Sequence, residues 1–263
     1  MKEISSSHND TYKNLKQLAS SAKHRRREGK TLLEGIHLCE SYLQHIGQPL
    51  MYVYSHSASE NDEVAQLMDA CDELPTPSVL LSDSHYRALS SVENGPGILF
   101  VVATPDVASP AKLRTNALLL EDIQDPGNMG TILRTAAAAG ITEVYASSAS
   151  ASAWSPKTLR AGMGAHFALT IYENCDLSDL IANSTTQVLA TSLEATESIY
   201  GIDLSQPTAW LFGNEGQGVS RELLALDVKK VIIPQNPHVE SLNVAAATAV
   251  CLFEQARQAN QQK

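Results

Sequence analysis

The sequence predicts an α/β protein in which a small α/β domain precedes a larger domain with a mostly parallel sheet flanked by helices. Two observations support this fold class. Short apolar runs alternate with segments of helical periodicity along the chain. Some of these runs, such as ALLLED from Ala117, are apolar on both faces, as buried parallel strands are. Such alternation implies right-handed crossovers between parallel strands.

The N-terminal part is predicted to end at a stretch rich in chain breakers. Residues 10–26 predict a helix with an apolar face through Leu15 and Leu18. The elements expected after it are strands at 50–55, 78–82 and 97–103 and helices at 61–73 and 83–92, the last capped by Asp83 or Ser84. Residues 104–116 contain two prolines and little apolar content. We therefore expect a domain at 1–104, a linker at 105–116 and a second domain at 117–263.

The second domain is expected to hold most of the parallel sheet. Its predicted elements are strands at 117–122, 143–147, 168–173, 187–192, 209–213 and 230–234, and helices at 131–140 and 243–258. Gly140 stands where a helix C-cap is expected, and the last helix carries an apolar stripe that includes Val244 and Val250. In such sheets ligands bind beyond the carboxyl ends of the strands.

Composition limits the class of protein. The chain has 263 residues with 43% hydrophobic and 18% charged, which is ordinary for a globular protein that buries a core. The polar N-terminus does not look like a signal peptide, and the longest apolar runs are too short to span a membrane. The four cysteines have no paired spacing and the eight histidines form no ligand-spaced pair. We expect a cytoplasmic protein with reduced thiols, without a metal and without a membrane partner.

The charge is distributed unevenly. The chain carries a net charge of −10, yet residues 1–35 contain eight Lys and Arg against four Asp and Glu. This segment has an excess of +4, so the remainder carries −14. Two interpretations remain open, namely an RNA-facing basic arm and an ordinary solvated helix face.

Three strand ends carry loops with unusual residues. The first is Asp125–Gly130, whose glycines allow close backbone approach and whose Asn128 is placed to cap a helix that also carries Arg134. An arginine early in a helix opposes the helix dipole, so it has either a function or a surface partner. The second is the glycine-rich turn Gly213–Gly218, which is neither a P-loop nor a dinucleotide-binding fingerprint.

The third loop runs from Ile232 to Asn243 and precedes the closing helix. It begins with Ile-Ile-Pro and ends with Ser-Leu-Asn. Ser241 and Asn243 are both suited to capping that helix, which is the simplest explanation for them.

Taken together and in this order, the three segments resemble the SpoU family of RNA ribose 2′-O-methyltransferases, also called the TrmH family. The matching positions are Asn128, Gly130 and Arg134, then Gly213, Glu215 and Gly218, and finally Ile233, Pro234, Ser241, Leu242, Asn243 and Val244. The match spans roughly residues 117–258. More loosely, RRREGKTLLEG at 25–35 is similar to the start of a small ribosomal-protein-like RNA-binding domain that precedes many of these catalytic domains.

The resemblance implies an enzyme that uses S-adenosylmethionine, forms a trefoil knot in its C-terminal domain and dimerises through that domain. It implies catalytic roles for Arg134, Asn128, Glu215, Ser241 and Asn243. It implies cofactor contacts at Leu211, Gly213, Asn214, Gly218, Ile232, Ile233, Pro234, Ser241 and Leu242. It implies RNA contacts at Arg25, Arg26, Arg27, Lys30 and Arg160. Arg134 is the residue that would activate the ribose hydroxyl, either as a base or by stabilising the developing alkoxide.

The sequence departs from the family pattern at four positions, which are Gln235, Pro237, Ala245 and Gly162. These departures concern cofactor contacts and target choice more than reaction type. The expected substrate is 23S ribosomal RNA. The alternatives are transfer RNA, a methylation that protects the ribosome from an antibiotic, and a non-catalytic RNA-binding protein that retains the fold.

Overall fold

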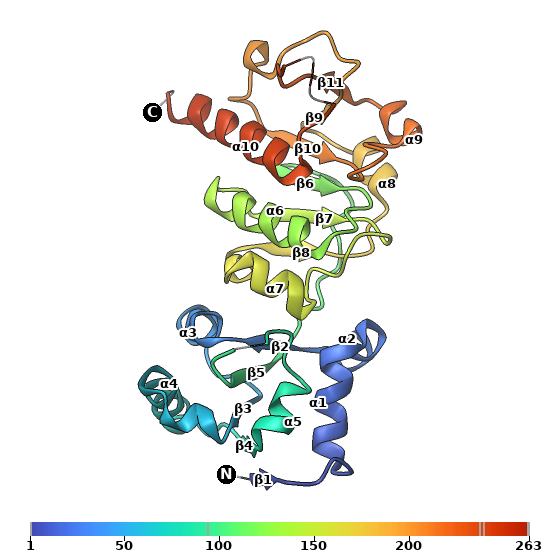
Figure 1. Cartoon of the computed structure of the whole chain (residues 1–263). Helices are drawn as coiled ribbons and strands as arrows, with labels where there is room; N and C mark the ends of the chain where they lie inside the picture. Colours follow the sequence, from blue (N-terminus) through green and yellow to red (C-terminus); the bar gives the residue numbers. More distant parts are fainter. Residues whose placement is uncertain (1, 94, 237, 239, 262–263) are drawn as a thin grey trace. The chain divides into compact units, whose positions relative to one another are not determined.

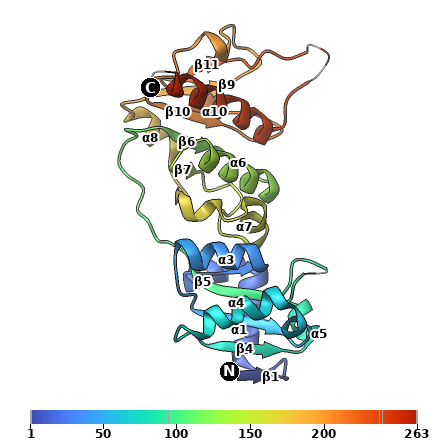
Figure 2. The same cartoon turned by 90° about the vertical axis from the view of Figure 1, so that its left-hand side faces the viewer.

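The computed structural model describes residues 2–93, 95–236, 238 and 240–261, so Pro237 lies outside the described residues. Contacts divide the chain into two compact units, whose elements Figures 1 and 2 trace from blue to red. The first unit contains the chain up to Asp106 together with Trp154–Phe167. The second contains Val107–Ala153 and the chain from Ala168 onward. The predicted domains, 1–104 and 117–263, placed residues 154–167 in the second domain. The limits of the domains stay a prediction.

The first unit is built on a five-stranded mixed sheet with the order β1-β4-β3-β5-β2. Its strands are β1 (Lys2–Ile4), β2 (Lys30–Glu34), β3 (Met51–Ser55), β4 (Ser78–Leu81) and β5 (Ile98–Ala103). β4 pairs in parallel with β1 and β3, whereas β5 pairs antiparallel with β3 and β2. The predicted strands 50–55, 78–82 and 97–103 are confirmed. The short β1 and β2 were not predicted.

The helix predicted at 10–26 is wrong as a single element. α1 (Asp10–Ser20) and α2 (Ala22–Glu28) are separated by Ser21, whose backbone is extended and whose hydroxyl accepts a hydrogen bond from His24 N. Serine competes for backbone hydrogen bonds in this way and so favours a new helix start. The buried guanidinium of Arg25 donates to Leu18 O at 2.8 Å, which ties the two helices together.

Three further helices complete the part of the first unit before Asp106. α3 (Ile36–His45) was not predicted, α4 (Asp62–Asp72) confirms the helix at 61–73, and α5 (Asp83–Arg87) is shorter than the predicted 83–92. Ser82, not Asp83 or Ser84, caps α5 by accepting from His85 N. The chain turns away from the helix after this, and the backbone N–H of Ser91 donates to the Glu34 carboxylate at 3.0 Å instead of continuing the helix.

Residues 154–167 add α7 (Pro156–Gly162) to the first unit. The hydroxyl of Thr31 in β2 donates to the carbonyl of Trp154 at 2.7 Å. Arg160 donates to the hydroxyl of Ser91 at 2.8 Å and to its carbonyl at 3.2 Å. This segment is therefore fixed to the rest of the unit at two points.

The second unit contains a six-stranded sheet in which every neighbouring pair is parallel. Its order is β11-β9-β10-β6-β7-β8. The strands are β6 (Ala117–Leu120), β7 (Glu143–Ala146), β8 (Thr170–Tyr172), β9 (Gln187–Thr191), β10 (Thr208–Phe212) and β11 (Lys229–Val231). The predicted fold class and all six predicted strands of this domain are confirmed, although β11 is shorter than expected because Ile232 pairs with Ser198 instead. The trefoil knot stays a prediction.

Helices cover both faces of this sheet (Figures 1 and 2). The long helices α6 (Pro126–Ala138) and α10 (Val244–Asn260) lie together on one face. α8 (Leu177–Ala182) and α9 (Arg221–Leu224) cover the other, where their leucines pack with Leu119 and Leu211 of the sheet. Because side chains alternate along a strand, each central strand is buried on both faces.

α6 corrects the prediction for the first motif. It begins at Pro126, before the expected residue 131, so the expected glycine loop forms the first helical turns. Asp125 is the N-cap, since its carboxylate accepts from Asn128 N at 2.8 Å, and Asn128 is not a cap. Proline at the first helical position favours this start. At the other end Ala139 is the C-cap, and Gly140 follows it with a φ of +82°.

The described part of the chain contains no helix with the length and apolar character needed to cross a membrane. The four cysteines are free, as expected, and all but Cys175 are buried.

Candidate active site

The three motif segments lie at the carboxyl ends of β6, β10 and β11, three parallel strands of the second sheet. Asp125–Gly130 follows β6, Gly213–Gly218 follows β10, and Ile232–Asn243 follows β11. Since parallel strands bring these ends to one edge of the sheet, segments about 100 residues apart in the sequence become neighbours.

A chain of side-chain hydrogen bonds joins the three segments. Asn243 Nδ2 donates to Asn128 Oδ1 at 3.0 Å, and Asn128 Nδ2 donates to Glu215 Oε1 at 3.1 Å. The Glu215 carboxylate also accepts from the backbone N–H groups of Gln124 and Asp125, each at 3.3 Å. Each motif thus supplies one member of a single network.

Asn243 fixes the orientation of this network. Its Oδ1 accepts from Ala245 N at 2.9 Å and Ala246 N at 3.3 Å, which caps α10 and leaves only Nδ2 to face Asn128. The Asn128 amide must then present its oxygen to Asn243 and its nitrogen to Glu215. The predicted capping role of Asn243 is confirmed, whereas Ser241 does not cap the helix.

The network holds Glu215 in its charged form. Desolvation raises the pKa of the Glu215 carboxyl, but the hydrogen bonds from Asn128 and from the backbone N–H groups outweigh it. The pKa therefore lies below its ordinary value, and the group is an anion at neutral pH.

The glycine-rich turn is held closed by Asn214. The side-chain Oδ1 of Asn214 accepts from Gly216 N and Gln217 N at 2.9 and 3.1 Å, and its Nδ2 donates to Asp122 O at 3.0 Å. A Cβ at Gly213 would lie 2.2 Å from the carbonyl carbon of Gly218, so no larger residue fits there. Asp122 itself has a φ of +54°, in the left-handed region that asparagine and aspartate tolerate.

A cavity of about 690 Å³ opens beside this network. Strand ends β9, β10 and β11 and the approach to α10 line it. Of the residues expected to bind a cofactor, those lining it are Gly213, Asn214, Gly218, Ile232, Ile233, Ser241 and Leu242, and Glu215 joins them. A volume of this size is typical of sites for small molecules and cofactors.

A model described as the SpoU rRNA Methylase family matches residues 115–253, which is more than half of the chain. The chain belongs to the SpoU rRNA methylase family. An uncharacterized tRNA/rRNA methyltransferase of Synechocystis is 36% identical over 97% of this chain and 93% of its own length. The 23S rRNA (guanosine(2553)-2′-O)-methyltransferase RlmP of Bacillus subtilis is 32% identical over 96% of this chain and 98% of its own.

Solved structures agree with this assignment of the SpoU fold. The crystal structure of an S-adenosylmethionine-bound rRNA methyltransferase from Sinorhizobium meliloti matches with a TM-score of 0.80 and 26% sequence identity. The match covers 97% of each chain, so it includes both units of the protein described here.

Two residues that were expected to bind the cofactor in this SpoU protein do not line the cavity. Leu211 is completely buried and packs in the core beneath the sheet, and Pro234 lies outside the lining. Leu211 was expected because it precedes the glycine-rich turn, but in a strand buried on both faces its side chain points into the core. The Leu211 side chain is therefore not placed to contact a ligand in the cavity, whereas cofactor contacts through the backbone of Leu211 and through Pro234 stay predictions.

Arg134 is not brought to the cavity within one chain. It is exposed on α6, and no ion pair or hydrogen bond of its side chain is formed with the described residues. Asn128 lies six positions earlier on the same helix, which places the two on different faces because each residue turns a helix by about 100°.

The segment after β9 also reaches the cavity, although it was not predicted to belong to the site. Thr191, Ser192, Leu193 and Glu194 line the cavity, as do Arg221, Gln235 and Glu240. A signal was present, because 187–192 was predicted as a parallel strand and its carboxyl end therefore faces the ligand edge.

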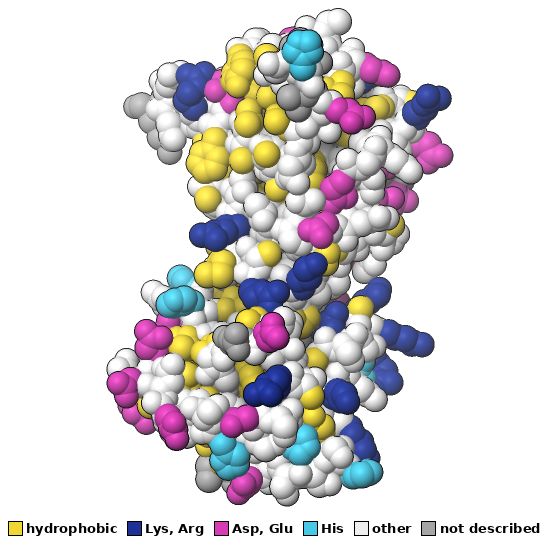
Figure 3. Space-filling model, in the orientation of Figure 1, with side chains coloured by type: hydrophobic (Ala, Val, Ile, Leu, Met, Phe, Trp, Pro, Cys, Tyr) yellow, Lys and Arg dark blue, Asp and Glu magenta, His cyan; other side chains and the backbone are white. Residues whose placement is uncertain are grey.

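The residues expected to bind RNA are all in the first unit. Arg26 and Arg27 are exposed on α2, and Lys30 is half-buried at the start of β2. Arg25 is a correction, since its guanidinium is buried and bonded to α1 and does not face solvent. Arg160 is half-buried and bonded to Ser91. Figure 3 shows Lys and Arg side chains gathered over the α1–α2 part of this unit.

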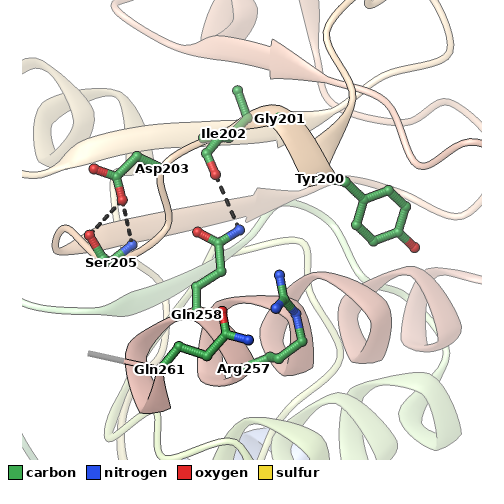
Figure 4. Close-up of a pocket in the computed structure, with 8 residues that line it drawn as sticks. All are labelled: Tyr200, Gly201, Ile202, Asp203, Ser205, Arg257, Gln258 and Gln261. Atoms are coloured by element: carbon green, nitrogen blue, oxygen red, sulfur yellow. Dashed lines mark hydrogen bonds between the residues drawn. The ribbon is translucent and has the colours of Figure 1, made fainter. Parts of the chain in front are cut away.

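A second cavity, of about 470 Å³, lies between the end of α10 and the turn at 199–205 (Figure 4). Two of its polar side chains bond to neighbouring groups of the protein. Gln258 donates to Ile202 O at 3.2 Å, and Arg257 donates to Glu254 at 2.7 and 2.8 Å. These contacts give the residues a role in anchoring α10, and we assign no ligand there. Among the described residues, no group of three or more His, Cys, Asp or Glu is placed to hold a metal.

Proposed function

We propose that this protein transfers the methyl group of S-adenosylmethionine to a ribose 2′ hydroxyl of 23S ribosomal RNA. The observation that carries the proposal is the hydrogen-bonded network of Asn243, Asn128 and Glu215, which unites the three family motifs beside the cavity. The name of the Bacillus subtilis relative supports 23S rRNA, and it makes guanosine the first nucleotide to examine.

S-adenosylmethionine fits the cavity by size and by chemistry. The glycines that line the cavity carry no side chain between their backbone groups and a ligand, and Leu242 supplies apolar surface for a base. The Sinorhizobium meliloti protein, which resembles this chain over its full length, is named as bound to this cofactor. The cofactor supplies an electrophilic methyl group, and the protein supplies binding and alignment.

We propose that Arg134 acts on the 2′ hydroxyl of the RNA ribose. A guanidinium remains protonated in proteins, so it suits the stabilisation of negative charge on the 2′ oxygen better than proton removal. The anionic Glu215 orients Asn128 and the first turn of α6, the helix that carries Arg134. Ser241, exposed at the cavity, is placed to contact the cofactor or the ribose.

We propose a homodimer in which Arg134 of the partner subunit completes the site. Within one chain Arg134 does not line the cavity, so a second copy would have to deliver it. The solvent face of α10 carries an apolar stripe through Ala246, Val250 and Phe253, and the Phe253 side chain is 52% exposed. Burial of this stripe against its symmetric copy is typical of a two-fold interface.

We also propose that the exposed cations of the first unit bind the RNA backbone and that the enzyme acts in the cytoplasm. Arg26 and Arg27 are exposed on α2. Arg26→Ala and Arg27→Ala should each reduce the slope of log affinity against log salt concentration by the amount expected for about one lost phosphate contact. A salt slope equal to that of the wild type would contradict this assignment.

The decisive experiment combines a variant with a map of methylated sites. Arg134→Ala should bind S-adenosylmethionine as the wild type does, yet lose methyl transfer to rRNA. Mapping 2′-O-methyl sites in total RNA from cells with and without the gene should show one 23S rRNA site disappear. Loss of a transfer RNA site would reassign the substrate, which the tRNA/rRNA name of the Synechocystis relative makes a specific alternative. Unchanged maps together with normal turnover by the variant would refute the proposal.

A further inference from the structure

The chain that follows β6 passes through Asp122 in a left-handed backbone conformation. Its φ is +54°, in a region that costs an L residue free energy, although less for aspartate and asparagine than for larger side chains. Such a conformation persists only where the surrounding contacts hold the residue in place. Asp122 does not line the cavity of about 690 Å³, so a direct contact with a ligand there does not account for it.

The loop that follows β7 holds both the backbone and the carboxylate of Asp122. The hydroxyl of Ser147 accepts from Asp122 N at 2.9 Å and donates to Asp122 Oδ1 at 2.6 Å. Two more hydrogen bonds join the same loops, from Ala151 N to Ile123 O at 2.7 Å and from Ile123 N to Ser150 Oγ at 3.3 Å. The conformation of Asp122 is therefore fixed by the neighbouring strand end.

The carbonyl of Asp122 bonds to the glycine-rich turn. Asn214 Nδ2 donates to Asp122 O at 3.0 Å. The Oδ1 of the same amide accepts from the backbone N–H groups of Gly216 and Gln217 at 2.9 and 3.1 Å. Because an amide has one donor group and one acceptor atom, the carbonyl of Asp122 selects the orientation in which Asn214 closes the turn. Glu215 of the hydrogen-bonded network lies in this turn, so its position depends on the same bond.

We propose that Asp122 is a positioning residue for methyl transfer, and that its left-handed carbonyl sets the glycine-rich turn. Ser147 keeps this carbonyl in place, and Asn214 transmits its position to the turn. Asp122 thereby acts on cofactor binding through the turn and on the reaction through Glu215. This inference rests on the proposed use of S-adenosylmethionine.

Three substitutions of Asp122 in the full-length protein separate conformation from charge. Asp122→Asn keeps an acceptor for Ser147 and tolerates the left-handed region, so its affinity and kcat should stay within about threefold of the wild type. Asp122→Gly keeps access to this region but loses the bond to Ser147, and it should be intermediate. Asp122→Ala loses both, so it should weaken S-adenosylmethionine about fivefold or more in calorimetric titrations and lower kcat.

Amide hydrogen exchange of the ligand-free protein gives a readout that does not depend on the cofactor. In Asp122→Ala the amides of Gly216 and Gln217 should exchange about five- to tenfold faster than in the wild type, because the Asn214 side chain is released. Ser147→Ala should raise exchange in the same amides to a smaller extent, and it carries the test if Asp122→Ala does not fold.

Asn174→Ala is the matched control. Asn174 also has a left-handed backbone, with a φ of +58°, in the loop that follows β8. The described part of the chain shows no hydrogen bond between Asn174 and the glycine-rich turn. Asn174→Ala should therefore lower Tm but leave the exchange of the turn and the affinity for S-adenosylmethionine unchanged.

The outcomes are distinguishable. Wild-type exchange and affinity in Asp122→Ala would overturn the proposal, as would a fall in Tm without any other change. Equal losses in Asp122→Asn and Asp122→Ala would also overturn it, since they would assign the effect to the charge of the side chain. Failure of the wild type to bind S-adenosylmethionine would instead refute the proposed cofactor, and the exchange measurement would still decide whether Asp122 sets the turn.

Discussion

The dual role of Asn243 can be separated by two substitutions at one position. Asn243→Ala removes both the cap on α10 and the donor to Asn128. Asn243→Asp keeps a side-chain oxygen for the N–H groups of Ala245 and Ala246 but has no donor for Asn128. Its negative charge at a helix N-terminus is favourable.

The expected changes in stability follow from these contacts. An N-cap contributes about 1 kcal/mol and a neutral hydrogen bond about 1 kcal/mol, so Asn243→Ala should lose about 2 kcal/mol. That loss corresponds to a fall in Tm of roughly 4–8 °C for a protein of this size. Asn243→Asp keeps the cap and should lose less than about 1 kcal/mol. Thermal unfolding followed by circular dichroism checks both values.

The expected changes in activity are different. In the Asn243→Asp variant, Asn128 cannot flip to donate to the new carboxylate without turning its own amide oxygen toward the Glu215 carboxylate, so both variants disturb the network. Methyl transfer from S-adenosylmethionine to rRNA should fall about tenfold or more in both, which corresponds to about 1.4 kcal/mol of barrier. Near-normal activity of Asn243→Asp would refute the role of the network. A loss of stability in Asn243→Asp equal to that in Asn243→Ala would refute the capping argument.

Three further outcomes are expected. Gly213→Ala should lower the free energy of unfolding by about 3 kcal/mol or more and weaken cofactor binding, because its Cβ would meet the Gly218 backbone at 2.2 Å. Gly201→Ala is the control, since no atom lies within 4 Å of its Cβ. It should change stability by less than about 0.5 kcal/mol in the same thermal melts. Trp210→Phe should lower the free energy of unfolding by about 2–4 kcal/mol, because the buried indole donates to Gln255 Oε1 at 2.8 Å. An unchanged midpoint in urea unfolding would contradict this. The hydrogen bonds from Arg257 lower the pKa of Glu254 to about 2, so its contribution to stability is complete above pH 4.5 and is lost as the pH falls toward 2. Glu254→Gln should therefore show a smaller loss of Tm over that range than the wild type.

Local sequence signals predicted most elements of the second unit. Runs such as ALLL and TAWLF are apolar on both faces, which only a sheet covered on both sides can bury, and all six strands were predicted. Helix limits were predicted less well. The sequence did not show that Ser21 would break a helix or that Asp125 would start one, because serine, aspartate and asparagine are all acceptable caps and the choice depends on neighbouring contacts.

The candidate site shows the same division. The resemblance to the SpoU family identified Asn128, Glu215 and Asn243 as one functional set, but only the fold brought them within hydrogen-bonding distance. The fold also buried two side chains that were expected at binding surfaces. Leu211 points into the core because of its position along the strand. The buried guanidinium of Arg25 donates to α1 at the junction of α1 and α2. In addition, the sequence did not indicate that Leu193 and Glu194 face the same cavity.

The sequence by itself determined the fold class through its periodicity. It determined the family through three motifs, and the reaction chemistry through the resemblance of those motifs to the SpoU family. Tertiary structure alone decided which side chains share the site. Residues from distant segments meet only when parallel strands align their carboxyl ends, and the orientation of each amide is set by a partner from another segment. Arg134 marks the boundary between the two, because its identity is read from the motif whereas it does not line the cavity of its own chain. Its delivery to the cavity of a partner subunit stays a proposal.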